Sequence, residues 1–139
     1  MKIIFVLKNY PDDNGIFPDT TLIKRPIIYL KPDSALLKDH KPFFVPDSLG
    51  EIQFGAELVV RICRLGKSIP RRFARRYYDA VTLGVNFIAV DLLKRLSEEG
   101  LPWESATGFD GSAVLGDWVS MEKFRDVQTI HFNLAVNGT

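Results

Sequence analysis

The sequence predicts a single β-rich α+β domain, and three observations carry that prediction. The chain has 139 residues, of which 46% are hydrophobic, and this suits one domain with a buried core. Several stretches alternate apolar and polar residues with a period of two, as half-buried strands do. Helical spacing is confined to residues 68–83 and 91–99. We therefore expect strands to dominate one domain that covers residues 1–139.

The charge and composition argue against several classes of partner. The net charge of +1 gives no general attraction to nucleic acid or to an anionic membrane. The single cysteine, Cys63, cannot form an internal disulfide and fits a reducing compartment. The apolar run of residues 3–7 is too short for a signal sequence or a membrane span. We expect a cytoplasmic protein with no nucleic-acid and no membrane partner.

The N-terminal part predicts two strands separated by a loop. Residues 1–7 alternate as a strand does, and the proline, glycine and Asx residues of 8–15 indicate a loop. Residues 26–31 (PIIYLK) predict the second strand, which opens on proline where a missing donor matters least. Short pieces at 35–37 and 42–45 then lead to the next long strand.

That long strand, Glu51 to Gly66, carries a carboxylate among apolar residues. We predict that one of its faces belongs to the core, namely Ile52, Phe54, Ala56, Leu58, Val60 and Ile62. The opposite face is mixed and has Glu57 at its centre. A carboxylate in such surroundings needs water, a cation or a hydrogen-bond donor to offset its desolvation. Glu57 is therefore either a metal ligand or a carboxylate paired with Arg61 or another base at the rim of the sheet.

The next segment predicts a helix, a strand and a second helix. Residues 68–83 have helical spacing, with Ser68 as a cap and Pro70 in the first turn. Residues 85–89 return to the alternation of a strand. Residues 91–99 are helical again, and Gly100 ends them.

The C-terminal part predicts a loop and two more strands. Residues 101–112 are loop-like, whereas 113–120 and 127–136 alternate as strands do. Asn137-Gly138 is a strong hairpin signal, yet only one residue follows it. This pattern predicts either a shortened chain or an edge that another chain completes. Because an unpaired apolar strand is a template for pairing, we expect self-association, with a dimer as the simplest form.

Three stretches together resemble one protein family. They are Lys31–Leu37 (KPDSALL), Ala56–Gly66 (AELVVRICRLG) and Gly108–Gly116 (GFDGSAVLG). Over nearly its whole length the chain resembles the fumarylacetoacetate hydrolase family, in particular short bacterial members often labelled hydroxyhepta-diene-dioate isomerases. The resemblance implies a mixed β-roll with a few peripheral helices, whose C-terminal part lies beyond this chain. It also implies Mg²⁺ or Mn²⁺ held by three carboxylates, and a small keto acid as substrate.

At the positions that the resemblance assigns to the cation, one carboxylate remains. The family's Glu-x-Glu pair reads Gly55-Ala56-Glu57, so only the second ligand is present. The position of the third ligand, an aspartate in the family, falls on Asn86. The resemblance therefore implies Glu57 and Asn86 as the remaining metal positions.

The positions for water and substrate differ as well. The family's His-x-x-Glu dyad falls on Asp13 and Ile16, so Asp13 is the candidate base, although it also suits a turn. The lysine that precedes the family's Phe-Asp pair is replaced by Thr107. The substrate-binding candidates that the resemblance implies are Asn9, Tyr10, Thr107 and Asp110.

Three functions follow, and whether the chain is an enzyme stays open among them. The first is a degenerate family member with little or no activity, acting in binding or assembly. The second is a divalent-metal-dependent hydrolase, isomerase or decarboxylase of small keto acids, with a site completed by oligomerisation. The third is an RNA-binding module built on the arginines of 71–76 beside Tyr77 and Tyr78, although their spacing favours a solvated helix face.

Overall fold

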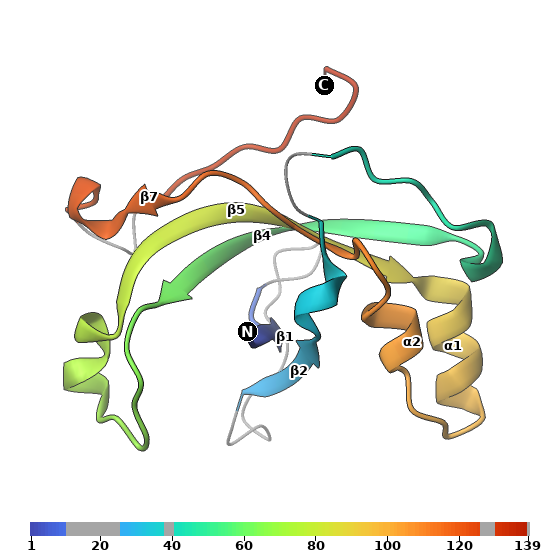
Figure 1. Cartoon of the computed structure of the whole chain (residues 1–139), viewed down its shortest axis with the longest axis horizontal. Helices are drawn as coiled ribbons and strands as arrows, with labels where there is room; N and C mark the ends of the chain where they lie inside the picture. The colour runs from blue at the N-terminus through green and yellow to red at the C-terminus, as the bar shows by residue number, and fades with distance from the viewer. Residues whose placement is uncertain (11–25, 38–40, 126–129, 139) are drawn as a thin grey trace.

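The computed structural model describes residues 1–10, 26–37, 41–125 and 130–138, and two long strands form its centre. β4 (Ile52–Ile62) and β5 (Tyr78–Ala89) pair antiparallel and make the curved arch in Figure 1. β6 (Ala113–Leu115) pairs antiparallel with β5, and β3 (Leu36–Leu37) pairs parallel with β6. The strand order is β3-β6-β5-β4, and β7 (Val119–Ser120) also pairs with β5. The predicted mixed sheet is therefore confirmed.

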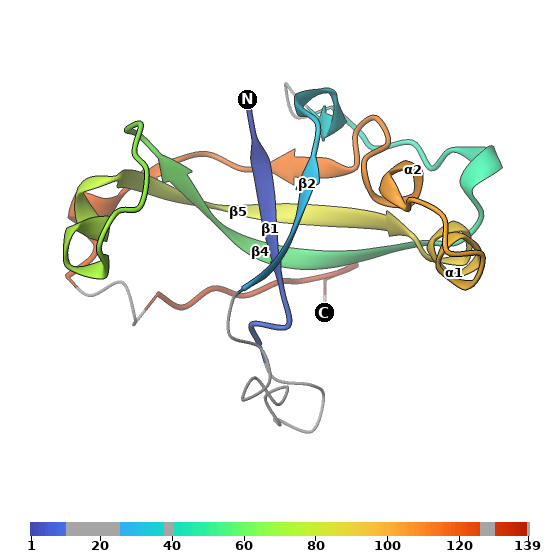
Figure 2. The same ribbon diagram turned by 90° about the horizontal axis from the view of Figure 1, so that it is seen from below.

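A small second sheet lies beneath the concave side of the arch. It consists of β1 (Ile3–Leu7) and β2 (Ile27–Lys31), which pair antiparallel. Both strands cross the direction of β4 and β5 at a steep angle, as Figures 1 and 2 show from two sides. The ring of Phe5 stacks on that of Tyr29 with centroids 4.9 Å apart. Tyr29 also belongs to the site described below.

Two short helices sit at one end of the arch. α1 (Val90–Glu98) continues directly from β5, and α2 (Glu104–Thr107) follows it. The predicted helix at 91–99 is confirmed within one residue at each end, and Gly100 ends it with a φ of 66°. Among the residues described, no helix has the length and apolar character that a membrane crossing requires. Short 3-10 helices cover Asp33–Ala35, Asp47–Leu49, Arg71–Arg76 and Met121–Lys123.

The prediction that one face of β4 belongs to the core is wrong for most of that face. Phe54, Leu58, Val60 and Ile62 are between 41% and 66% exposed. This face is turned away from β2, and Leu83, which lies opposite Leu58 on β5, is also exposed. The structure describes no element that covers these side chains. The buried residues instead come mainly from β5 and its neighbours, including Ala80, Val81, Ala89, Ala106, Ala113 and Met121.

The prediction of a helix over residues 68–83 is also wrong. Only Arg71–Arg76 is helical, as a 3-10 helix, and Pro70 rather than Ser68 precedes it, without a side-chain cap. From Tyr78 onward the chain is β5 and also contains the strand expected at 85–89. The physical reason is the long ladder with β4, because Val81, Thr82 and Val85 prefer the extended backbone that such pairing offers.

The C-terminal strand predictions are confirmed in part. Residues 113–120 form the two short strands β6 and β7 rather than one. Residues 130–136 form no strand, and residues 127–129 lie outside the described part of the chain. Although residues 130–136 alternate in sequence, they pair with no strand among the described residues. Without such pairing an extended segment gains no backbone hydrogen bonds between strands. Asn137 and Gly138 have φ values of 54° and 84°, the positive sign that a type I′ turn requires.

Candidate functional site

The register of the arch brings Glu57 and Asn86 to the same face. Gly55 lies opposite Asn86, and Glu57 lies opposite Gly84, so the two polar side chains are diagonal neighbours. The Asn86 amide Nδ2 lies 3.4 Å from Glu57 Oε1 and donates to it. Asn86 is buried and Glu57 half-buried. The two residues that the resemblance assigned to the cation therefore lie side by side.

The small sheet adds two further polar side chains. Tyr29 and Lys31 alternate along β2 and are both buried, with 7% and 2% of their surface exposed. The Tyr29 hydroxyl accepts a hydrogen bond of 2.8 Å from Asn86 Nδ2. Neither residue was predicted as part of a site. The signal lay in the alternation of PIIYLK, which places a tyrosine and a lysine on one side of a strand.

The Lys31 ammonium is anchored by backbone carbonyls. Its Nζ donates to the carbonyl oxygens of Phe87, at 2.9 Å, and of Ser112, at 2.7 Å. It also lies 5.1 Å from the centroid of the Phe5 ring, within cation–π range. The Ser112 hydroxyl donates to the carbonyl of Thr107 at 3.0 Å. One ammonium thus joins β2 to β5 and to the segment before β6.

Tyr29, Lys31, Glu57 and Asn86 form a polar cluster. Burial changes the pKa values of its three titratable members. Burial lowers the pKa of Lys31 to about 8, although the Glu57 carboxylate opposes this change. Burial raises the pKa of Tyr29 to about 12, and it raises the pKa of Glu57 above its ordinary value. The Asn86 hydrogen bond and the Lys31 charge both oppose the change at Glu57. Burial thus disfavours the charged forms of Lys31 and Glu57, while each charge favours the other.

These residues do not fit a cation centre made of three carboxylates. The described residues contain no group of three or more His, Cys, Asp or Glu side chains that could hold a metal ion. Position 55 contributes no side chain, and a Cβ atom there would meet no atom within 4 Å. Asn86 contributes a neutral amide, whose Nδ2 donates to Tyr29 and Glu57 and whose Oδ1 is buried without a hydrogen-bond partner. A hard cation prefers several carboxylate oxygens, and Glu57 alone supplies them here.

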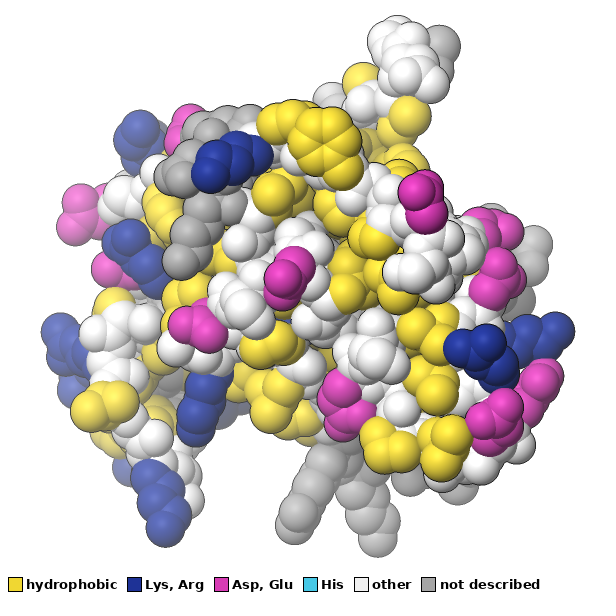
Figure 3. Space-filling view, turned by 45° about the vertical axis from the view of Figure 1, so that its right-hand side comes forward, with side chains coloured by type: hydrophobic (Ala, Val, Ile, Leu, Met, Phe, Trp, Pro, Cys, Tyr) yellow, Lys and Arg dark blue, Asp and Glu magenta, His cyan; other side chains and the backbone are white. Residues whose placement is uncertain are grey.

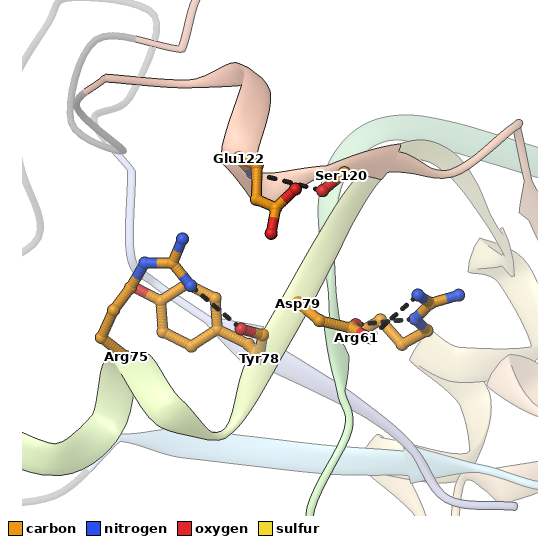
Figure 4. A network of polar contacts seen from close by, with 6 residues as sticks. All are labelled: Arg61, Arg75, Tyr78, Asp79, Ser120 and Glu122. Carbon is orange, nitrogen blue, oxygen red and sulfur yellow. Dashed lines mark hydrogen bonds and ion pairs between the residues drawn. The ribbon is translucent and has the colours of Figure 1, made fainter.

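The interpretation of Glu57 as a partner of Arg61 is wrong. Arg61 instead binds Asp79 with two contacts, Nε to Oδ1 at 2.8 Å and Nη2 to Oδ2 at 3.0 Å (Figure 4). The ladder register shifts between Arg61 and Ile62, and this irregularity leaves Asp79 without a partner opposite it. The nearby base that Glu57 does have is Lys31. The structure therefore supports the other alternative, in which a base different from Arg61 lies near Glu57.

The remaining predicted residues lie in different places. Asn9 and Tyr10 follow β1 and are exposed, and the electrostatic effect of Tyr10 on Tyr29 raises the Tyr29 pKa slightly. Thr107 is buried at the end of α2 and connects to Lys31 through Ser112. Asp110 is exposed at a hollow that it shares with Asp33 and Lys41. Asp13 lies outside the described residues.

Comparison with known proteins gives a consistent set of relatives. The family profile described as "Fumarylacetoacetate (FAA) hydrolase C-terminal" matches residues 2–139. The mitochondrial oxaloacetate tautomerase FAHD1 of Rattus norvegicus is 29% identical over 137 residues, which are 99% of this chain and 62% of that protein. The uncharacterized protein PYRAB13970 of Pyrococcus abyssi is 30% identical over 140 residues, or 99% of this chain and 60% of that one.

Solved structures share the fold. A 5-carboxymethyl-2-hydroxymuconate delta-isomerase from Mycobacterium smegmatis superimposes with a TM-score of 0.67 and 29% identity, covering 85% of this chain and 45% of that one. A fumarylpyruvate hydrolase from Pseudomonas aeruginosa, solved in complex with Mn²⁺ and pyruvate, gives 0.70 and 24% identity. It covers 88% of this chain and 53% of the other. This chain therefore spans about half to three fifths of the length of these relatives.

Proposed function

The chain belongs to the fumarylacetoacetate hydrolase family, and on that premise we propose that it keeps the family's sheet but has little or no metal-dependent activity on keto acids. The observation that supports this proposal is the pair of facing positions on β4 and β5, Gly55 and Asn86, neither of which carries a carboxylate. If each missing charge-assisted contact is worth roughly 1.5 to 3 kcal/mol, cation affinity falls by roughly two to four orders of magnitude. Efficient cation-dependent turnover then has no basis in these residues.

The polar cluster supports the same proposal in a second way. Asn86 donates a hydrogen bond to the Glu57 carboxylate and Lys31 contributes a positive charge, and both oppose the effect of burial on the Glu57 pKa without a metal ion. Lys31 is itself held by two carbonyls. Both charged groups therefore have contacts within the protein, which supports a structural role for the cluster. We propose that the chain serves in binding or assembly rather than in catalysis.

A second candidate function is a metal-dependent hydrolase, isomerase or decarboxylase of small keto acids. The observation that favours it is the unpaired, buried Oδ1 of Asn86, whose amide nitrogen Nδ2 lies 3.4 Å from Glu57 Oε1. Carboxylate and amide oxygens are donors of the type that Mg²⁺ and Mn²⁺ accept, and in this candidate a second copy of the chain supplies further ligands. Oxaloacetate tautomerases and a fumarylpyruvate hydrolase among the relatives make small keto acids the substrate class to test. A dimer and a cytoplasmic location stay predictions.

Calorimetric titration of Mn²⁺ and Mg²⁺ into the purified protein separates the two candidates. The matched control is Glu57→Gln, which keeps the size of the side chain and removes its charge. We expect no binding in the micromolar range with either protein. Micromolar binding that Glu57→Gln abolishes, together with metal-dependent dimerisation in sedimentation velocity, would favour the second candidate instead.

Turnover provides the other half of the test. Oxaloacetate tautomerisation and acylpyruvate hydrolysis are followed by ultraviolet absorbance with added Mn²⁺. We expect rates at the level of the metal-only background. A rate that reaches the median of ordinary enzymes, on the order of 10 s⁻¹, would refute the proposal of little or no activity.

A further inference from the structure

The hairpin between β4 and β5 concentrates positive charge far from the polar cluster. We call residues 62–78 the basic arm; it covers the end of β4, the loop, the 3-10 helix Arg71–Arg76 and the start of β5. It contains six basic residues and no acidic one, namely Arg64, Lys67, Arg71, Arg72, Arg75 and Arg76. With +6 on the arm and +1 on the whole chain, the rest of the chain has a net charge of −5.

The charges on the basic arm are exposed and lack acidic partners. All six basic side chains are exposed, and dark blue side chains gather along the left edge of Figure 3. In the part of the chain that the structure describes, none of these six side chains forms an ion pair. Figure 1 shows the arm extending at the left, at the opposite end of the arch from α1. The arm is therefore a region of uncompensated positive potential.

The basic arm also has an apolar hollow of about 290 Å³. Ile62, Ile69, Ala74 and Tyr77 line it, with Arg64 at the same opening. Gly66 lets the loop approach closely, since a Cβ atom there would lie 2.5 Å from Tyr77 Cε1. Ile62 is 66% exposed and Leu65 is fully exposed beside it. The volume suits one apolar side chain of a partner, with one cation, Arg64, in the lining.

Two of the three aromatic rings of the arm, those of Phe73 and Tyr78, are already covered by its own arginines. The guanidinium carbons of Arg72 and Arg76 lie 4.9 and 5.0 Å from the centroid of the Phe73 ring. Arg75 lies 5.0 Å from the Tyr78 ring and donates to the Tyr78 carbonyl at 3.2 Å (Figure 4). Single-stranded nucleic acid needs open aromatic faces on which bases stack. The planar forks of the guanidinium groups match carboxylates and phosphates alike, so the choice between these partners depends on the apolar hollow.

We propose that the basic arm binds an acidic peptide segment of a partner protein, with one apolar side chain of that segment in the hollow. Carboxylates on either side of this apolar residue contact the exposed arginines. A lipid surface would leave the hollow unfilled, and a nucleic acid would gain nothing from the apolar lining of the hollow. Charge complementarity and the hollow together favour the peptide.

Fluorescence anisotropy with a labelled synthetic peptide tests the proposal. The probe has one phenylalanine between two runs of glutamate, and the control probe has serine in place of the phenylalanine. We expect saturable binding of the first probe that weakens with added salt, and clearly weaker binding of the second. Absence of binding, or equal binding of both probes, would overturn the proposal.

Two pairs of variants assign the binding to the arm. Arg72→Ala with Arg76→Ala weakens binding about fivefold through the loss of two exposed contacts. Ile62→Ser with Ile69→Ser weakens it about tenfold through the loss of the apolar lining. The matched control is Lys94→Ala with Arg95→Ala, which removes two exposed cations from α1 and leaves binding unchanged.

Folding and competing partners complete the design. Circular dichroism confirms that each variant is folded, and Arg72→Lys with Arg76→Lys keeps the charge if the alanine variants fail to fold. We expect these lysine variants to keep most of the affinity. Tighter binding of polyuridylate, or of vesicles that contain phosphatidylserine, than of the phenylalanine probe would show that the arm serves a different class of partner and would overturn the proposal.

Discussion

Restoring the two absent carboxylates should create a cation site if their absence is what limits metal binding. The change is Gly55→Glu with Asn86→Asp, on facing positions of β4 and β5 beside Glu57. Space exists for the first substitution, because a Cβ atom at Gly55 meets no atom within 4 Å. The second substitution is isosteric. Together the two positions and Glu57 would present three carboxylates on one face of the sheet.

The expected gain follows from the number of new charged contacts. Two contacts of roughly 1.5 to 3 kcal/mol each amount to roughly 3 to 6 kcal/mol, or an increase in Mn²⁺ affinity of roughly two to four orders of magnitude. Without metal, the variant should be less stable than the natural protein, because three neighbouring carboxylates repel one another and their pKa values rise. Saturating Mn²⁺ should reverse this loss, since a ligand at about 100 times its Kd adds about 2.7 kcal/mol.

Calorimetry and thermal unfolding with and without Mn²⁺ measure both effects. The control is Gly55→Gln with Asn86→Gln, which adds side-chain bulk and amide oxygens without charge. We expect Mn²⁺ binding and stabilisation in the carboxylate variant alone. A folded carboxylate variant that binds Mn²⁺ no better than the natural protein would refute the reasoning, because ligand charge would then not be the limiting factor.

Three further predictions concern stability. Gly84→Ala should destabilise the protein by about 2 kcal/mol, because its Cβ would lie 2.7 Å from the Val114 carbonyl oxygen. Gly55→Ala, where a Cβ meets open space, should change stability by less than about 0.5 kcal/mol. Urea denaturation compares the two variants, and equal midpoints would contradict the close approach at Gly84. Phe43→Ala should cost about 1 to 2 kcal/mol in the same assay, because it removes a ring stacked 4.0 Å from Phe87, and an unchanged midpoint would count against that packing. The pKa of Lys31 is about 8 in the folded protein and 10.5 in an unfolded chain, so the unfolded state binds more protons between these two pH values. The free energy of unfolding should therefore rise by about 1 to 3 kcal/mol over this pH range. Lys31→Met should lack this rise, and identical pH profiles of the two proteins would contradict the role of Lys31.

The strand β4 and the last part of β5 were predictable because they depend on a period of two, and the resemblance assigned Glu57 and Asn86 to one site. The helix expected over 68–83 was wrong because local spacing competes with pairing. The run Arg71–Arg76 does form a helical turn, but the antiparallel ladder with β4 takes over at Tyr78. Alternation also said nothing about which face of β4 is covered. That depends on which other elements pack there, and the pattern of one strand does not contain this information.

The site was predictable only where a ligand position could be read from one strand. Tyr29 reaches Asn86 and Lys31 reaches the Phe87 carbonyl from another sheet, across sequence separations of more than 50 residues. No periodicity links such distant positions. The alternation on β2 showed that the two side chains share a face, but the identity of their neighbours required the packing of the small sheet against the arch.

The anchoring of Lys31 has a consequence for how the protein opens. A two-stranded sheet is marginal by itself, so β1 and β2 depend on the arch for their persistence. The carbonyl oxygen of Ser112 accepts hydrogen bonds from Lys31 Nζ and from the Phe87 amide. It therefore links a residue of the small sheet to a residue of the arch. Breaking the ammonium contact would loosen β2 and one rung of the arch together. In native-state hydrogen exchange, the amides of β1 and β2 and that of Phe87 should therefore exchange as one cooperative unit rather than as separate layers.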